Sequence, residues 1–271
     1  MKNMFGIENK VAIITGASGS LAGSIAKSFA GSGVKLALLT RNTHTLDTLL
    51  TDIKDIGGQA KAYEADILDE NNLVTVKNQI LADFGSIDVL LNIAGGNLPG
   101  ATAEIDQTIF DISIDAFKKV TDLNLNGTVI PSLVFGKVMS EQKEGVIINY
   151  SSMAVDRAIT RVAGYSASKA AMENFTRWMA VEMALKFGEG IRVNAIAPGF
   201  FIGKQNRALL TNSDGSYTQR GNDIIKNTPM RRFGEIGELN GAIHFLCSDA
   251  AKFITGTVLP VDGGFSAFSG V

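Results

Sequence analysis

Seven short runs rich in valine, isoleucine, leucine and alanine recur along the chain, and segments with helical periodicity lie between most of them. Several runs are apolar at nearly every position, which is typical of parallel strands covered on both faces. Strands and helices that alternate in this way predict right-handed crossovers and a doubly wound parallel sheet. The predicted strands are residues 11–15, 35–40, 60–66, 88–95, 145–152, 191–199 and 257–264.

The segments between the strands complete a Rossmann-type α/β architecture, with helices on both faces of a sheet of about seven strands. A chain of 271 residues is near the upper limit for one hydrophobic core, so we expect a single domain over residues 1–271. Gly33 and the pair Gly57–Gly58 stand where helices are expected to end, because glycine readily adopts the left-handed conformation. The predicted helices are residues 21–32, 43–56, 69–84, 115–139, 165–187 and 238–248.

The charge balance argues against a nucleic acid or a membrane as a partner. The chain has 25 basic and 27 acidic residues and a formal net charge of -2, so no overall field attracts a polyanion. The N-terminal apolar run is too short for a signal peptide or a spanning helix. A single cysteine, Cys247, is expected to be a buried apolar filler. These features together indicate a cytoplasmic protein.

The segment VAIITGASGSLAGSIA leads from the first predicted strand into the first predicted helix, with Gly16, Gly19 and Gly23 near the turn. Glycines at such a turn let backbone N–H groups and a helix N-terminus approach a diphosphate without interference from a Cβ atom. In a doubly wound sheet, ligands bind beyond the carboxyl ends of the strands. We therefore predict a nucleotide site at this edge, although a glycine turn alone also occurs without a ligand.

A phenol and an amine stand one helical turn apart at Tyr165 and Lys169, and Ser152 precedes the tyrosine by 13 residues. The i,i+4 spacing places Tyr165 and Lys169 on one face of a helix. A phenol has a pKa of about 10, and a nearby ammonium is expected to lower it. The pair is therefore predicted to exchange a proton with a substrate oxygen that the Ser152 hydroxyl holds.

Several motifs occur in the order and at the spacing of one known family: TGASGSLA, NIAG, Asn124 within DLNLNGT, Ser152, YSASK, APG and the closing VDGGF. Over nearly the whole chain the sequence resembles the short-chain dehydrogenases/reductases. The resemblance implies an enzyme that transfers a hydride between a nicotinamide cofactor and a carbonyl or secondary alcohol. It implies four catalytic residues, Asn124, Ser152, Tyr165 and Lys169.

Two of these assignments have a neighbour that competes for the role. The spacing to Tyr165 favours Ser152 over Ser151, and the match to the family's NL dipeptide favours Asn124 over Asn126. A non-catalytic nucleotide-sensing module with this fold is the alternative of a different class. It would be expected to have lost the tyrosine or the lysine, and both are present.

The resemblance also implies a set of cofactor contacts at the strand ends. Ser20 and Ala22 stand where the family has glycine, and Gly203 stands where it has a threonine whose hydroxyl bonds the carboxamide. Small residues keep the loop compact, so cofactor binding is expected to persist with an altered turn. The implied contacts are Gly16, Ser18, Gly19, Ser20, Leu21, Arg41, Asp66, Ile67, Asn92, Ala94, Gly95, Tyr165, Lys169, Pro198, Gly199 and Ile202.

The end of the second predicted strand indicates which nicotinamide cofactor is preferred. Thr40 stands where a family member that prefers NAD often has an aspartate, and Arg41 follows it. A guanidinium can hold a 2′-phosphate through two parallel hydrogen bonds. NADP(H) is therefore favoured, with NAD(H) as the alternative if Arg41 only stacks on adenine or lies in solvent.

A polar, basic stretch at about residues 200–232, hereafter the lid segment, is too long for a simple connection and is predicted to cover the substrate. Its arginine, lysine and amide groups suit a hydroxylated carboxylate better than an apolar chain. With the loop GGNLPGATAEIDQTIFDIS, it resembles the D-mannonate oxidoreductase (fructuronate reductase) branch, which implies interconversion of D-fructuronate and D-mannonate. Gluconate 5-dehydrogenase-like and 3-oxoacyl reductase activities are the alternatives. The predicted substrate contacts are Asn97, Ser152, Arg161, Lys204 and Arg207.

The two longest predicted helices, residues 115–139 and 165–187, carry apolar side chains on more than one face. Such helices must be covered, so we expect them to pair across a two-fold axis, and the tail GGFSAFSGV to support a second interface in a homotetramer. No metal site is expected, because His44 and His244 are isolated in the sequence and are interpreted as structural.

Overall fold

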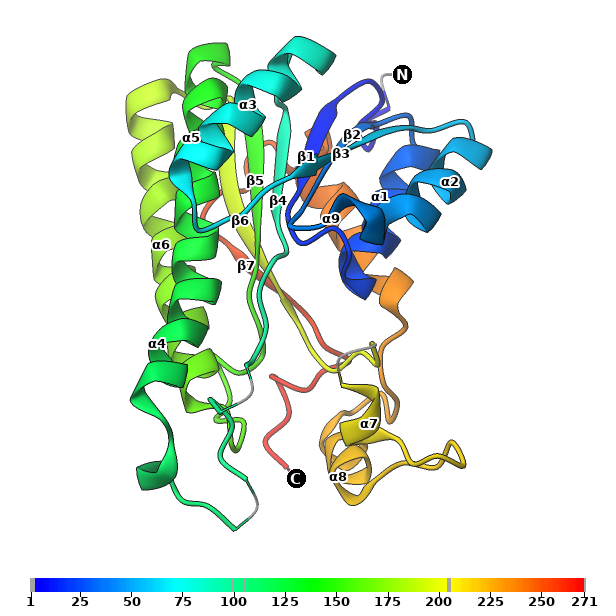
Figure 1. Ribbon diagram of the computed structural model, residues 1–271, viewed down its shortest axis with the longest axis vertical. Coiled ribbons are helices and arrows are strands. Elements are labelled where there is room, and N and C mark those ends of the chain that lie inside the picture. The colour runs from blue at the N-terminus through cyan, green and yellow to red at the C-terminus, as the bar shows by residue number, and fades with distance from the viewer. Residues whose placement is uncertain (1–2, 99, 105, 204–205, 271) are drawn as a thin grey trace.

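The computed structural model describes residues 3–98, 100–104, 106–203 and 206–270. Seven strands form one sheet in the order β3-β2-β1-β4-β5-β6-β7, and every neighbouring pair is parallel (Figure 1). All seven predicted strands are confirmed. Their bounds are β1 (Val11–Ile14), β2 (Lys35–Thr40), β3 (Gln59–Glu64), β4 (Val89–Asn92), β5 (Gly145–Tyr150), β6 (Ile191–Pro198) and β7 (Val258–Val261).

Helices cover both faces of this sheet. On one face α1 (Ser20–Gly31), α2 (Asp47–Asp55) and α9 (Asn240–Cys247) share a core with β1, β2, β4 and β5, and buried Cys247 is part of that core, as expected. On the other face lie α3 (Glu70–Phe84), α5 (Gly127–Gln142) and α6 (Ala163–Phe187). Short 3₁₀ turns occur at Thr43–Leu46, Ile109–Asp111, Ile236–Leu239 and Asp249–Ala251. No helix in the described ranges is long and apolar enough to cross a membrane.

The predicted single helix over residues 115–139 is wrong in one respect. It is two helices, α4 (Ile114–Thr121) and α5, joined by a π-helical turn at Asp122–Asn126. Within this turn the buried Asn124 amide donates to the carbonyls of Val120, at 2.7 Å, and Gly96, at 2.8 Å. Its oxygen accepts the Gly96 N–H at 2.9 Å. The wider turn therefore brings the Asn124 amide to the backbone that follows β4.

The lid segment contains two helices that the sequence analysis did not predict, α7 (Arg207–Leu210) and α8 (Gln219–Asn227). They enclose a small apolar cluster of Leu210, Ile224 and Phe233, separate from the two sheet cores. The few apolar residues of the lid segment are scattered among polar ones, so helical periodicity is weak in this part of the sequence. In Figure 1 this segment lies beyond the carboxyl ends of the strands, near the C-terminus.

We predict that Asn124→Ala lowers the free energy of unfolding by about 1 to 3 kcal/mol, because it leaves the N–H and C=O of Gly96 without their partner. Asn126→Ala is the control, since that exposed amide bonds only to the Asp122 carboxylate at 3.0 Å. Urea unfolding of the two variants measures the difference. Equal stabilities would contradict a structural role for the Asn124 amide.

Candidate active site

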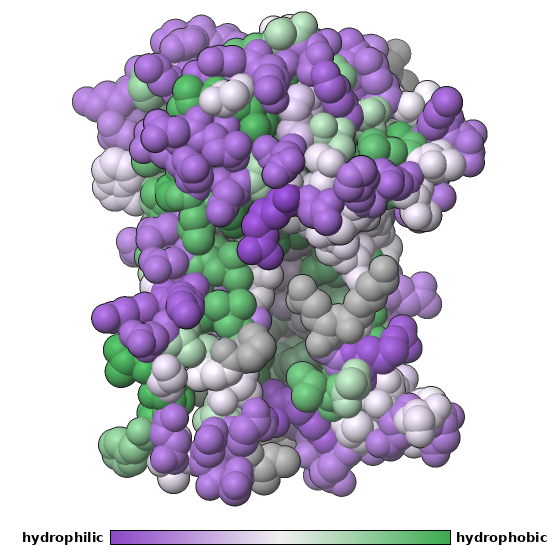
Figure 2. Space-filling model, viewed as in Figure 1, coloured by the Kyte–Doolittle hydropathy of each residue, from purple (hydrophilic) through white to green (hydrophobic). Residues whose placement is uncertain are grey.

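The carboxyl ends of β1 to β6 meet around a cavity of about 780 Å³, where the sheet topology predicts a ligand site. The face seen in Figure 2 is hollowed at its centre. The cavity extends from Arg41 and Asp66 at one end to Tyr165 and Phe200 at the other. Its elongated lining suits a ligand with several linked groups. Of the predicted cofactor contacts it includes Gly16, Ser18, Gly19, Ser20, Leu21, Arg41, Asp66, Ile67, Ala94, Gly95, Tyr165, Lys169, Pro198 and Gly199.

The glycine turn after β1 leaves room for a backbone-bound anion. Gly16 has φ +62°, and a Cβ there would lie 2.8 Å from the Cα of Ala94, so only glycine fits. The Gly19 N–H closes the turn on the Gly16 carbonyl at 2.9 Å. Gly19 is also the N-cap of α1 and has no side chain to cover the first turn. The positive end of α1 therefore opens on the cavity, where it can hold a phosphate.

At the β2 end of the cavity, no carboxylate follows the strand. Thr40 is buried and bonded to the Asn42 carbonyl at 3.4 Å, while the Arg41 side chain is exposed. Asp66 accepts the Leu68 N–H at 3.0 Å, and buried Ile67 forms part of the wall. This end can receive an adenosine with an anionic substituent close to the Arg41 guanidinium.

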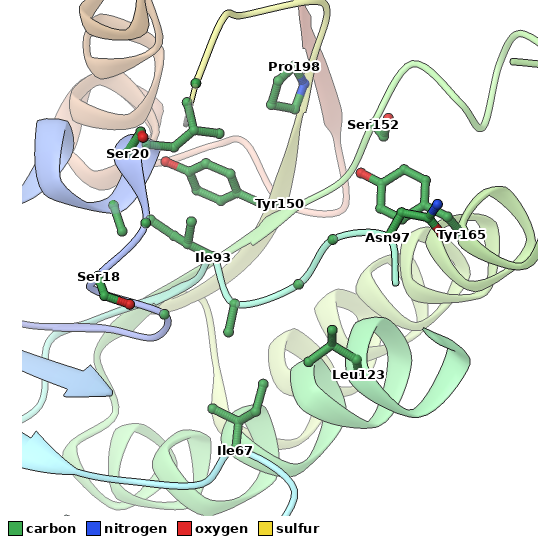
Figure 3. A pocket seen from close by; sticks show the side chains of 18 of the residues that line it. Ser18, Ser20, Ile67, Ile93, Asn97, Leu123, Tyr150, Ser152, Tyr165 and Pro198 are labelled. Carbon is green, nitrogen blue, oxygen red and sulfur yellow. The ribbon is translucent and has the colours of Figure 1, made fainter. Parts of the chain in front are cut away.

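The other end of the cavity brings together Ser152, Tyr165 and Lys169. Figure 3 shows Ser152 beside the hydroxyl end of Tyr165. The Ser152 hydroxyl is hydrogen-bonded to the Tyr165 phenol. Lys169 is buried, and its Nζ donates to the Tyr150 carbonyl oxygen at 2.6 Å. The same Nζ lies 5.7 Å from the centroid of the Tyr165 ring. A strand end and the first two turns of α6 thus present a phenol, a hydroxyl and an amine to one space.

The prediction that Lys169 lowers the pKa of Tyr165 is wrong for the protein without ligands. Burial raises the pKa of Tyr165, and the hydrogen bond with Ser152 opposes this rise. Burial also lowers the pKa of Lys169 to about 8. Desolvation disfavours the charged form of each group, so a neutral phenol lies beside an amine that loses its proton readily.

The contacts distinguish the competing serines and asparagines. The Ser151 hydroxyl donates to the buried Glu173 carboxylate at 2.5 Å, whereas Ser152 contacts the phenol. A Cβ built on Gly95 would lie 2.7 Å from Asn124 Oδ1 and 3.4 Å from Lys169 Nζ, so both side chains adjoin this glycine. The Asn126 amide points instead to Asp122. These contacts therefore favour Ser152 over Ser151, and Asn124 over Asn126, for the roles that the sequence analysis predicts.

Some predicted contacts lie behind the cavity wall. Asn92 is buried, and its amide nitrogen donates to Ser132 and Asn149, so it supports the wall. Asn124 likewise supports the wall, because its amide oxygen accepts the Gly96 N–H. Ile202 packs against the apolar cluster of Leu210, Ile224 and Phe233 in the lid segment. None of the three is among the lining residues.

The predicted substrate contacts have different positions. Asn97 lines the cavity, and its amide donates to the Thr102 hydroxyl. Arg161 does not line it: its guanidinium holds the Ala103 carbonyl and the Glu104 carboxylate. Arg207, at the start of α7, is exposed and is also absent from the lining. Lys204 lies outside the described residues.

The cavity lining also includes side chains to which the sequence analysis gave no contact, among them Tyr150, Leu98 and Leu123. Tyr150 ends β5, so its position at a strand end was the available signal for it. Across the residues that the structure describes, no group of three or more His, Cys, Asp or Glu side chains could hold a metal ion. His244 contacts Ser28 at 3.0 Å and packs edge-on to Phe29, as a structural histidine would.

Fold and site together define an NAD(P)-dependent oxidoreductase that acts on alcohol or carbonyl groups. A family model described as enoyl-(acyl carrier protein) reductase matches residues 16–266. The chain belongs to the short-chain dehydrogenase/reductase family.

Three similar proteins cover almost the whole chain. An uncharacterized oxidoreductase of Haemophilus influenzae is 45% identical over 98% of this chain and 96% of its own. A solved structure from that organism, called a D-mannonate oxidoreductase and holding NAD, is 44% identical. The match has a TM-score of 0.91 and covers 99% of this chain and 100% of the other. A solved structure from Beutenbergia cavernae, called a gluconate 5-dehydrogenase and holding NADP, is 31% identical. Here the TM-score is 0.86, and the match covers 98% of this chain and 100% of the other.

The buried amine of Lys169 has a measurable effect on stability. Its folded pKa of about 8 lies below its ordinary value of 10.5, so between these values the unfolded chain binds more protons than the folded one. We predict that its contribution to the free energy of unfolding rises with pH across this range, by about 1.4 kcal/mol per pH unit, and is constant below it. Urea unfolding of the protein and of Lys169→Met, at pH values from 7 to 10, gives the difference. Parallel profiles would contradict a lowered pKa.

Proposed function

We propose that this protein transfers a hydride between a nicotinamide cofactor and a carbonyl or secondary alcohol of a sugar acid, most specifically between D-fructuronate and D-mannonate. The observation that carries the proposal is the Ser152–Tyr165 hydrogen bond beside buried Lys169, at one end of a cavity of about 780 Å³. Chemistry of this kind needs one group that exchanges a proton with the reacting oxygen while the cofactor supplies or accepts the hydride.

The proposed roles follow from the contacts. Ser152 holds the reacting oxygen against the Tyr165 hydroxyl, which gives its proton in reduction and takes it back in oxidation. Because burial raises the pKa of Tyr165, the phenol keeps its proton at neutral pH and is ready for reduction. The Lys169 amine, fixed on the Tyr150 carbonyl, is placed to donate to ribose hydroxyls. Asn124 positions the Gly95–Gly96 backbone beside this amine.

Positive charges on and beside the lid segment support an anionic substrate. Arg220, on α8, donates to the Thr160 hydroxyl at 3.3 Å, which connects the lid segment to the loop before α6. Burial and the charge of nearby Arg161 lower the pKa of Arg220. Two guanidiniums therefore lie near each other, and the Arg161 ion pair with Glu104 neutralises only one of them. A substrate carboxylate is the group that would complement this excess charge.

The name of the Haemophilus structure supports the same substrate, and the Beutenbergia name supports a gluconate 5-dehydrogenase as the close alternative. A relative from Synechocystis that is called a 3-oxoacyl-[acyl-carrier-protein] reductase, 32% identical to this chain, supports a 3-oxoacyl reductase as the other alternative. For the cofactor, exposed Arg41 and the absence of a carboxylate directly after β2 support NADP(H). The NAD in the Haemophilus structure supports NAD(H) as a second cofactor.

We predict that D-fructuronate oxidises NADPH faster than NADH. Its kcat/KM should exceed that of D-fructose, which lacks the carboxylate, by about 10- to 100-fold, because one charged hydrogen-bonded pair is lost. The substrates to compare also include 5-keto-D-gluconate and an acetoacetyl thioester, and the absorbance of the reduced cofactor measures each rate.

Tyr165→Phe should reduce kcat by about 100- to 10,000-fold. Full turnover by Tyr165→Phe would refute the mechanism, and a thioester as the best substrate would refute the sugar acid.

The outer face of α5 and α6 supports a homotetramer. Four apolar side chains on these helices are largely exposed, with Trp178 at 63% and Leu185 at 76%, and soluble monomers rarely expose such a patch. We propose that this face pairs across a two-fold axis and that the C-terminal tail supports the second interface. The four side chains are Leu133, Trp178, Val181 and Leu185.

We predict that the protein sediments as a tetramer at micromolar concentration and that Trp178→Asp with Val181→Asp dissociates it to a dimer, since two carboxylates would be buried at the two-fold interface. Ile56→Asp, at the exposed end of α2, is the control and should leave the tetramer intact. Sedimentation velocity separates the species. A monomeric wild type would overturn the proposal.

A further inference from the structure

The hydroxyl of Tyr150 is a buried polar group that has no hydrogen-bond partner among the described residues. Only 4% of Tyr150 is exposed, although the residue lines the cavity. Within the described part of the chain, two other buried side-chain atoms lack a partner, Asn92 Oδ1 and Ser166 Oγ, and neither residue is part of the lining. An orphaned buried hydroxyl costs stability unless a ligand or a water supplies the missing bond. Among the residues with described side chains, Tyr150 is thus the one whose unsatisfied group a cavity ligand can complete.

The surroundings of this hydroxyl indicate what that ligand carries. In Figure 3 the Tyr150 ring lies between Tyr165 and the first turn of α1, and its oxygen points to the side where Ser20 begins that helix. A Cβ built on Gly203 would lie 3.6 Å from Ser20 Oγ, so the start of the lid segment closes the same corner. α1 has a glycine N-cap and no acidic residue in its first turn. A phenol donor and the positive end of a helix there face one space, and both complement an anion.

The phenol is held firmly and stays neutral. The Tyr150 carbonyl accepts from Lys169 at 2.6 Å, which fixes the backbone of this strand end. Its ring belongs to the core between the sheet and α1. Burial raises the pKa of Tyr150, so the hydroxyl keeps its proton and can only serve an anion as a donor.

We propose that the Tyr150 hydroxyl donates a hydrogen bond to a phosphate oxygen of the cofactor's diphosphate. This contact joins the diphosphate site to the catalytic site through one residue, whose hydroxyl serves the first and whose carbonyl holds Lys169 in the second. The inference rests on the nicotinamide cofactor of the proposed function but not on its substrate.

The test is Tyr150→Phe, measured by calorimetric binding of NADP⁺, NAD⁺, ADP-ribose and 2′-phospho-ADP-ribose, together with the Tm of the ligand-free protein. We expect a Kd about 10-fold higher for every ligand, since each contains the diphosphate. The Tm should be unchanged or higher, because the variant removes an unsatisfied polar atom from the core. Tyr63→Phe is the matched control: its phenol donates to Asp83 of α3 at 2.6 Å, in the other sheet core and outside the cavity lining, so Tm should fall and every Kd should stay the same.

Unchanged Kd values in Tyr150→Phe would overturn the proposal and leave a buried water as the partner of the phenol. A loss confined to NADP⁺ and NAD⁺ would also overturn it, because the contact would then be to the nicotinamide half. A lower Tm would show that the hydroxyl is already satisfied in the ligand-free protein. If Tyr150→Phe weakens ADP-ribose binding as expected while the wild-type protein turns over no sugar acid, the phosphate contact stands and the proposed function fails.

Discussion

The hydrogen bond from the Lys169 amine to the Tyr150 carbonyl, 2.6 Å long, connects α6 to the end of β5 and fixes the geometry on which the site depends. Ser152 lies two residues beyond the strand end, and Tyr165 lies one turn before the lysine. The bond therefore sets how far the hydroxyl lies from the phenol. It also keeps a buried amine satisfied, which an apolar core would otherwise penalise.

Burial affects the two ionisable groups at this bond in opposite directions. It raises the pKa of Tyr165 and lowers that of Lys169, so both charged forms are disfavoured before any ligand enters. A substrate oxygen and ribose hydroxyls would replace water as partners for these groups. In the proposed mechanism the phenol then exchanges a proton with an oxygen that Ser152 already holds, and little rearrangement is needed.

Much of the fold could be predicted because its signals are local. Most strands are short apolar runs, and the glycine turn at Gly16 precedes a helix with clear periodicity. The strand ends then place Ser152 and Asp66 at one edge of the sheet without further information. Arg161 could not be placed in this way, because its partners, Ala103 and Glu104, belong to a loop with no regular pattern.

Other features depend on contacts between distant parts of the chain. The π-helical turn exists because Asn124 reaches the Gly96 backbone, and no periodicity in residues 115–139 reports that contact. The pKa of Tyr165 was expected to fall because the i,i+4 spacing shows the lysine but not the burial of both groups. The sequence places Tyr150 in a strand, but the lack of a partner for its hydroxyl depends on how α1 and the sheet pack around it.

The most direct test of this account is a crystal structure with oxidised cofactor and a sugar-acid substrate bound. The distance to measure joins the Tyr165 hydroxyl oxygen to the reacting oxygen of the substrate. The account predicts a hydrogen bond at about 2.5 to 3.0 Å, with Ser152 bonded to the same oxygen. A reacting oxygen bonded to neither hydroxyl, with the nicotinamide at the other end of the cavity, would contradict it.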